Sequence, residues 1–264
     1  SGGNYNTVVG DEAGTAITYG DSNTGFGYGA VKATTSGSQN IGVGVNALAS
    51  NTTASNNTAV GHNSLAANTT GTQNTAVGAS ALDANTTGTN NVAIGKSALS
   101  LDTLGARSVA VGVGALENQN FTSTTTTGNT AIGFTALQET TTGLHNTGVG
   151  YAALEANTTG AFNTALGRLA GASNTTASRN TFVGQSAGTT NTTGTSNVAL
   201  GDNALLSNTT ASNNTAIGKD ALKDNITGTY NTAVGSLSLE NTTSGISNTA
   251  VGGQALQGNT TGDY

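Results

Sequence analysis

Apolar and polar positions along this chain follow a pattern that repeats every 17 residues. A glycine follows each short run of small and branched residues, as in Ala76-Val77-Gly78. These anchor glycines stand at residues 10, 27, 44, 61, 78, 95, 112, 133, 150, 167, 184, 201, 218, 235 and 252. Their spacing is 17 residues throughout, except for 21 residues between Gly112 and Gly133. Such a period predicts stacked units that bury their apolar faces against one another.

The repeat unit itself reads Asn-Thr-Ala-Val-Gly-x-x-Ala-Leu-x-x-Asn-Thr-Thr-Gly-Thr-x, and residues 57–73 follow it almost unchanged. Seventeen residues are too few for a pair of helices, and Gly, Thr, Asn and Val are poor helix formers. A short strand joined by tight corners fits this length. We therefore predict an all-β fold, a single-chain parallel β-solenoid of about fifteen 17-residue coils that runs continuously over residues 1–264.

The Thr-Ala-Val strand places Thr and Val on one side and Ala on the other. A leucine at the fourth position after the anchor glycine, as in Leu48 and Leu65, predicts a second apolar ladder. We expect each coil to bury one Val, one Leu and a few Ala, so that Ala165 and Leu200 are both interior. Because a solenoid has one interior, the other side of the strand should be an apolar stripe or a contact with another chain.

An asparagine precedes the strand in fourteen of the fifteen coils, from Asn6 to Asn248, with Ser108 as the exception. Asparagine tolerates left-handed backbone and can bond to its copy one coil away, so we predict a stacked corner ladder; a ligand-binding row is the alternative. Two segments depart from the repeat. Residues 11–22 form a degenerate first coil, and residues 117–128 contain four extra residues that should protrude as a loop.

Composition narrows the function classes. Of 264 residues only 8% are charged, the net charge is −6, and Pro, Cys, Met and Trp are absent. The few Lys and Arg cannot form the basic stripe that nucleic-acid binding requires. No apolar run reaches the length of a membrane span, so we expect no membrane insertion. The absence of cysteine excludes disulfides and thiolate metal sites.

Catalytic constellations are not evident in the sequence. The two histidines, His62 and His145, stand five coils apart and cannot share a metal or a catalytic triad. Asp220 and Asp224 are the nearest approach to a carboxylate pair, but flanking lysines make a surface ion-pair cluster the better interpretation. We therefore predict a protein that is not an enzyme, with no catalytic residues, no metal and no cofactor.

Units such as Asn57-Thr58-Ala59-Val60-Gly61 and Asn91-Val92-Ala93-Ile94-Gly95 resemble the head repeats of trimeric autotransporter adhesins. They resemble still more the related repeats of phage tail fibres and of bacterial proteins that end in a fibre-type intramolecular chaperone. The resemblance spans residues 6–262, although the adhesin repeat is usually shorter and lacks the long Asn-Thr-Thr-Gly corner. It implies left-handed solenoids packed side by side as a homotrimer, located outside the cell, on a cell surface or on a virion.

Recognition of a partner is expected at the columns where the repeat varies, namely after the anchor glycine and before the strand asparagine. Exposed aromatic and arginine side chains are the usual anchors of binding surfaces. The candidate receptor contacts, for a cell-surface glycan or protein, are Tyr28, Phe121, Phe134, Tyr151, Phe162, Arg168, Arg179 and Tyr230. The alternative is that these columns are tolerant surface positions that accept any residue.

These observations favour a non-enzymatic extracellular fibre or adhesin segment, a rigid rod that binds a cell or environmental surface. One alternative is a self-assembling filament subunit, because the sequence begins and ends nearly in phase with the repeat and shows no cap, which favours end-to-end stacking. Another is an ice-binding protein, because Thr70-Gly71-Thr72 and Thr193-Gly194-Thr195 are examples of a Thr-x-Thr array.

Overall fold

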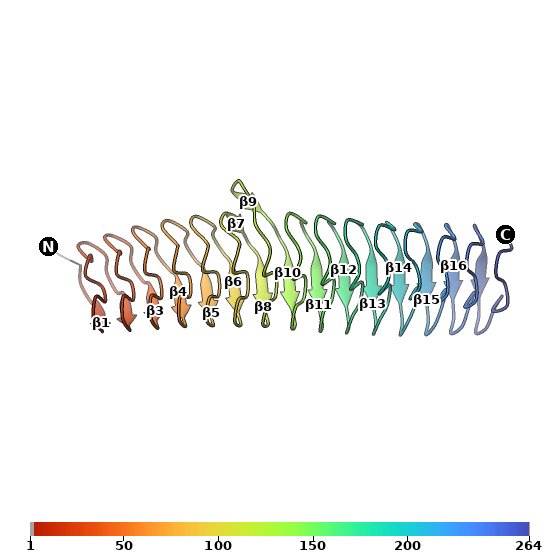
Figure 1. Ribbon diagram of the computed structural model, residues 1–264, viewed down its shortest axis with the longest axis horizontal. Coiled ribbons are helices and arrows are strands. Elements are labelled where there is room, and N and C mark those ends of the chain that lie inside the picture. Colours follow the sequence, from red (N-terminus) through yellow and green to blue (C-terminus); the bar gives the residue numbers. More distant parts are fainter. Residues whose placement is uncertain (1–2, 264) are drawn as a thin grey trace. The chain divides into compact units, whose positions relative to one another are not determined.

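The computed structural model describes residues 3–263, and this range contains strands and turns but no helix. Its contacts divide the chain after Asn129 into two compact units. In each unit, successive coils contribute one short strand, and the strands lie side by side in chain order (Figure 1). Residues 1, 2 and 264, at the ends of the predicted solenoid, lie outside the described residues.

The strands of the first unit that stack in this way are β1 (Thr7–Val9), β2 (Thr24–Phe26), β3 (Ile41–Val43), β4 (Thr58–Val60), β5 (Thr75–Val77), β6 (Val92–Ile94) and β8 (Val109–Val111). Those of the second unit are β10 (Thr130–Ile132), β11 (Thr147–Val149), β12 (Thr164–Leu166), β13 (Thr181–Val183), β14 (Val198–Leu200), β15 (Thr215–Ile217), β16 (Thr232–Val234) and β17 (Thr249–Val251). All of them have three residues and begin directly after the conserved position of the repeat that holds asparagine or Ser108.

Neighbouring strands pair in parallel, and each residue lies opposite its copy one repeat away, as Thr58 lies opposite Thr75. Hydrogen bonds extend the ladder beyond the strand at both ends. The amide of Thr58 donates to the carbonyl of Asn74 at 2.9 Å, and the amide of Gly61 donates to the carbonyl of Val43 at 2.8 Å. The predicted parallel β-solenoid with a 17-residue coil is therefore confirmed.

The interior is narrower than the sequence predicts. The central strand residue faces inward, and Ala59 and Ala165 are fully buried, as is Leu65 on the returning segment. The third strand residue faces outward, however, and Leu200 is 45% exposed. The expectation that each coil buries its Val, and that Leu200 is interior, is wrong. The leucine of the returning segment already fills the space, so that mostly alanine or glycine fits opposite it.

Two ladders of buried asparagine run through this interior. In the predicted ladder, the backbone amide of Asn74 donates to Asn57 Oδ1 at 3.0 Å, and Asn74 Nδ2 donates to the carbonyl of Gly88 at 2.8 Å. A second ladder, which we did not predict, is formed by the asparagine of the Asn-Thr-Thr triplet. There Asn68 Nδ2 donates to Asn51 Oδ1 at 2.9 Å. All these asparagines are fully buried, so the core is apolar on one side and amide-bonded on the other.

Left-handed backbone recurs at the same positions of every coil. Asn56, Asn63 and Leu65 have φ values of 63°, 53° and 51°. The anchor glycine is more extreme. Gly61 has a φ of 136°, and a Cβ there would lie 2.5 Å from the carbonyl oxygen of Gly78 on the next coil. Only glycine satisfies both the dihedral angle and this close approach, which explains why the anchor position never varies.

The degenerate first coil, residues 11–22, is irregular only in sequence. Its flanking strands keep the common register, with Thr7 opposite Thr24. The coil therefore follows the same backbone path as its neighbours, although it carries exposed side chains such as Tyr19.

The inserted segment forms a small parallel pair of its own, β7 (Gly105–Ala106) with β9 (Thr125–Thr126). Figure 1 shows this part of the first unit standing out beyond the neighbouring corners. The exposed stretch covers mainly residues 122–126. Gln119 and Thr127 are fully buried, so the protruding part is shorter than the predicted loop 117–128.

Candidate binding surface

Each strand turns its first and third side chains outward, and we call the surface that these side chains form the strand face. Its first positions hold only Thr, Val and Ile, and its third positions only Val, Ile, Leu and Phe. Several of these side chains are well exposed, among them Phe26 at 57% and Leu166 at 50%. Neither position holds a charged residue in any coil. Each unit therefore presents an uncharged, largely apolar surface of a kind that is unusual on monomeric soluble proteins.

Variable columns border the strand face at both ends of the strands. In the column that follows the anchor glycine, the rings of Phe134 and Tyr151 stack with centroids 5.6 Å apart and an interplanar angle of 8°. On the next coil, the guanidinium carbon of Arg168 lies 5.8 Å from the centroid of the Tyr151 ring. We call these three residues the tyrosine ladder.

A second row of the same chemistry lies in the column that precedes the strand asparagine. The rings of His145 and Phe162 stack with centroids 5.3 Å apart and an interplanar angle of 22°. Arg179 occupies the same column on the following coil. We call these residues the histidine ladder. His145, which occupies the same variable column as Phe162, thus stands beside a predicted contact residue.

The structure therefore gathers five of the predicted contacts into two rows on the second unit; they are Phe134, Tyr151, Arg168, Phe162 and Arg179. Tyr28, 48% exposed, lies on the first unit, and Tyr230, 64% exposed, lies on the second unit several coils beyond the ladders. Both are available at the surface, but within residues 3–263 neither is stacked on another ring.

Phe121 is the exception among the candidates. Only 7% of this residue is exposed, because the inserted segment folds its beginning back into the coil. Its carbonyl accepts a hydrogen bond from Thr103 Oγ1 at 3.2 Å. Phe121 therefore belongs to the interior of the inserted coil, and its assignment as a receptor contact is corrected.

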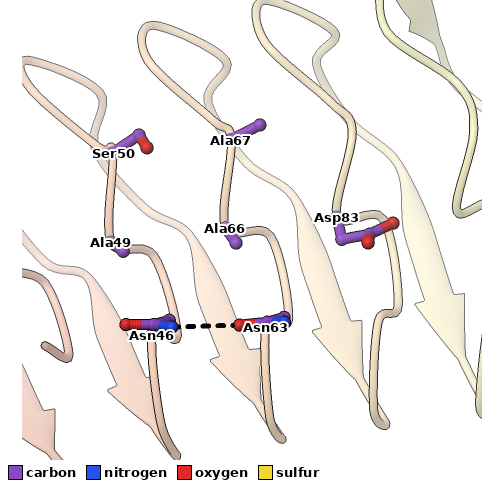
Figure 2. Close-up of a pocket in the computed structure, with 7 residues that line it drawn as sticks. All are labelled: Asn46, Ala49, Ser50, Asn63, Ala66, Ala67 and Asp83. Carbon is purple, nitrogen blue, oxygen red and sulfur yellow. Dashed lines mark hydrogen bonds between the residues drawn. The ribbon is translucent and has the colours of Figure 1, made fainter. Parts of the chain in front are cut away.

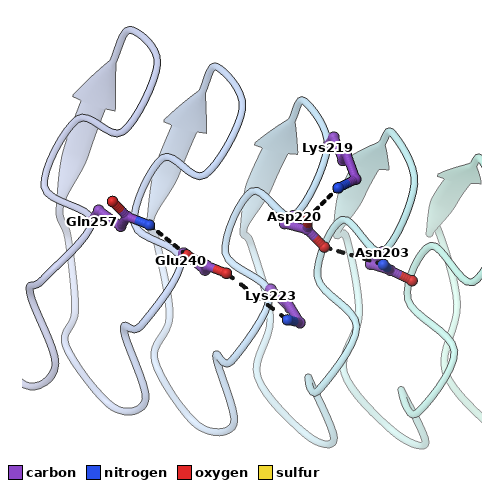
Figure 3. Close-up of polar contacts among 6 residues, drawn as sticks. All are labelled: Asn203, Lys219, Asp220, Lys223, Glu240 and Gln257. Carbon is purple, nitrogen blue, oxygen red and sulfur yellow. Dashed lines mark hydrogen bonds and ion pairs between the residues drawn. The ribbon is translucent and has the colours of Figure 1, made fainter.

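Charged side chains of the second unit pair along neighbouring coils (Figure 3). Lys219 Nζ lies 3.1 Å from Asp220 Oδ2, and Asn203 Nδ2 donates to Asp220 Oδ1 at 3.1 Å. Burial alone would raise the pKa of Asp220, but the hydrogen bonds from Asn203 and Lys219 lower it below its usual value. This carboxylate is therefore held ionised, as a structural ion pair requires.

A second ion pair joins two neighbouring coils of the same region. Lys223 Nζ lies 3.8 Å from Glu240 Oε1, and Gln257 Nε2 donates to Glu240 Oε2 at 2.7 Å. The ion-pair cluster predicted around Asp220 is present, with Glu240 as the acidic partner of Lys223 in place of Asp224. Partly exposed pairs of this kind contribute little to stability, and their geometry suggests no catalytic pair.

A shallow depression lies on the returning segments of the first unit (Figure 2). Its lining consists of Asn46, Ala49, Ser50, Asn63, Ala66, Ala67 and Asp83. Asn46 Nδ2 donates to Asn63 Oδ1 at 3.2 Å, and burial raises the pKa of Asp83. The depression exists because alanines stand where other coils carry longer side chains. With a single carboxylate and no histidine, it offers no acid–base pair.

The described residues hold no group of three or more His, Asp or Glu side chains placed to bind a metal ion. Over residues 3–263 there is also no helix with the length and hydropathy needed to cross a membrane. Comparison of the chain with protein-family models and with curated proteins finds no match. The strand face, the tyrosine ladder and the histidine ladder are therefore the surfaces of this chain best suited to bind a partner.

Proposed function

We propose that this chain is a non-enzymatic segment of an extracellular fibre or adhesin, in which copies of the chain associate side by side through the strand face. The observation that carries the proposal is the exposed, uncharged strand face, which continues on every coil of both units. The resemblance of the repeats to those of trimeric adhesins and tail fibres supports a homotrimer on a cell or virion surface.

A second copy of the same chain is the partner that fits this face best. Apolar surface gains about 25 cal/mol for each Å² that is removed from water. Coils stack about 4.8 Å apart, so a partner with the same rung spacing can place a branched side chain against every branched side chain. A partner without this period would lose its match within a few coils. The absence of charge on the face leaves no ionic group to desolvate.

Static light scattering on the purified chain tests the proposal with a matched pair of variants. Wild type should show a multiple of the 25.6 kDa chain mass. Val60→Arg combined with Val77→Arg places charge on the strand face and should give a folded monomer. Ala79→Arg adds charge at an exposed position beside the face and should keep the assembly. A wild-type monomer at micromolar concentration would overturn the proposal.

The threonine array supports ice binding as a second candidate. Thr70 is exposed and Thr72 half-buried, on either side of the buried Gly71, so both residues reach the surface. Thermal hysteresis of the wild-type chain, abolished by Thr70→Val and by the same change in neighbouring coils, would favour this function. No hysteresis is expected if the chain is a fibre segment.

A further inference from the structure

The tyrosine ladder exposes ring edges to solvent, and both faces of its Tyr151 ring are covered within the ladder. Phe134 and Tyr151 cover one another, and Arg168 lies over the other side of Tyr151. About half of each aromatic residue remains exposed. The edge of an aromatic ring carries a partial positive charge and its face a partial negative charge. The outward side of this ladder is therefore a strip of positive ring edges that ends in a guanidinium group.

The histidine ladder repeats this chemistry one coil further along. His145 and Phe162 are stacked in the same manner, and Phe162 is 56% exposed. Arg179 follows in the same column. Two aromatic residues and one arginine thus occur in the same order at both ends of neighbouring strands. The facing sides of the rings within each pair are covered by one another, so the ring edges and the arginines are the groups that each ladder offers along its exposed side.

The charge around the two ladders has one sign. Both arginines are exposed, and among the described residues neither has an acidic partner. Over residues 128–185, the strand face and its two flanking columns contain no Asp or Glu. The chain as a whole carries a net charge of −6, so this is a positive area on an acidic protein. The cation–π contact with Tyr151 also holds Arg168 in place while leaving its hydrogen-bond donors free.

We propose that the tyrosine and histidine ladders bind a carboxylate-bearing polysaccharide, with Arg168 and Arg179 each holding a sugar carboxylate. A planar guanidinium group matches a carboxylate in a bidentate geometry. The ring edges and the hydroxyl of Tyr151 face the hydroxyl oxygens of the sugars. The inference rests on the proposed function, because it names the ligand class of an adhesive fibre segment.

Isothermal titration calorimetry on the full chain tests this with four polymers of stated chemistry. Polygalacturonate offers carboxylates on sugars, dextran sulfate offers sulfates, poly-L-glutamate offers carboxylates without sugars, and dextran is neutral. We expect polygalacturonate to bind most tightly at 0.15 M salt. Loss of one charge-assisted contact should weaken binding about tenfold, so Arg168→Gln and Arg179→Gln should each do so.

The chain contains a matched control for these changes. Lys96 and Arg107 occupy the same two columns with the same separation, on the first unit, and both are exposed. No aromatic residue precedes either of them on the adjacent coil. Lys96→Gln combined with Arg107→Gln should change the affinity for polygalacturonate by less than about twofold, as expected for a screened distant charge.

Three outcomes would overturn the inference. The first is that wild type does not bind polygalacturonate, and the second is that Lys96→Gln combined with Arg107→Gln weakens binding as much as Arg168→Gln or Arg179→Gln does. The third is that dextran, dextran sulfate or poly-L-glutamate binds as tightly as polygalacturonate. Light scattering on the same samples separates this result from the proposed function. An assembled chain that binds no polygalacturonate contradicts only the ligand, whereas a monomer contradicts the fibre proposal itself.

Discussion

The ring of Phe182 occupies the space that a side chain at residue 188 would need. A Cβ on Gly188 would lie 2.4 Å from Cε1 of Phe182, and a Cβ on Gly171 would lie 2.6 Å from Cδ2 of the same ring. Most other coils carry alanine in the strand centre and leucine at the positions of these glycines. One large residue on the strand has therefore replaced two leucines on the returning segments, which conserves the volume of the core.

This exchange predicts a strong coupling between the two sites. Gly188→Leu alone should destabilise the protein by about 1–3 kcal/mol through overpacking. Phe182→Ala alone should cost about 3–5 kcal/mol because it leaves a cavity. The triple variant Phe182→Ala, Gly171→Leu and Gly188→Leu restores the common repeat and should be more stable than Phe182→Ala alone. Thermal melting monitored by circular dichroism measures all three, and additive effects would contradict the coupling.

Substitution by aspartate can distinguish the buried positions of the strand from the exposed ones. Ala165→Asp places a carboxylate in the interior without a partner and should cost about 3–5 kcal/mol. Leu200→Asp changes an outward residue of the strand face, and Ala79→Asp an exposed corner. In protein diluted until the chains are monomeric, both should alter the melting temperature little, since surface changes usually stay within about 0.5 kcal/mol. Equal melting temperatures for Ala165→Asp and Ala79→Asp would contradict the observed orientation of the strand.

The sequence predicted the coil, its period and its parallel pairing, because a 17-residue repeat with one invariant glycine admits few folds. It did not predict which side of the strand is interior, because Val and Ala are both apolar. A signal was present nonetheless. The strand centre is restricted almost entirely to Ala and Gly, as expected for a tight space, whereas the third position accepts residues as different as Val9 and Phe26.

The buried asparagines should contribute to stability because they form hydrogen bonds with buried backbone groups. In Asn74→Ala, the amide of Asn91 loses its acceptor, whereas the carbonyl of Gly88 loses one donor and keeps the longer hydrogen bond from Asn85 Nδ2 at 3.2 Å. Each buried group left without a partner costs about 1–3 kcal/mol. Asn241→Ala, at an exposed position, is the control and should be nearly neutral. Chemical denaturation measures the difference, and equal stabilities would show that the ladder contributes nothing.

Asp102 interrupts the second asparagine ladder. It is fully buried, accepts hydrogen bonds from the amide of Gly105 at 3.0 Å and from Gln119 Nε2 at 2.8 Å, and its burial raises the pKa of its carboxyl group. Asn85 Oδ1, which in a regular coil would accept from the next asparagine, has no partner in the described structure. A protonated Asp102 would carry the hydrogen-bond donor that this ladder lacks next to Asn85 Oδ1.

The contribution of Asp102 to the stability should therefore fall as the pH rises. The unfolded carboxyl group titrates near pH 4, so the folded protein binds the extra proton between that value and the raised pKa of Asp102. The corresponding stability is complete below about pH 4 and is lost as the pH rises through the folded pKa. Asp102→Asn should remove this part of the pH dependence and raise the melting temperature at pH 7. A wild type and variant with parallel pH profiles would contradict the assignment.

The tyrosine and histidine ladders were only partly predictable from the sequence. The variable columns identified Phe134, Tyr151, Phe162 and both arginines from the sequence, since the period alone places them at the surface. Phe121 was misplaced because the inserted segment has no period, and nothing in its sequence shows that its beginning folds inward. The stacking of His145 on Phe162 follows from their 17-residue separation, a relation that could have been used.

The strand face is exposed in one chain, and the proposed association would cover it. The protein contains no cysteine, so single cysteines report this directly through their rates of reaction with a maleimide. Leu200→Cys should react slowly in the assembled protein, and rapidly when Val183→Arg and Ile217→Arg on the adjacent strands prevent association. Gln185→Cys, at an exposed corner, should react rapidly in both. If Leu200→Cys reacts in the otherwise wild-type protein as fast as Gln185→Cys, the strand face is not an interface between copies of this chain.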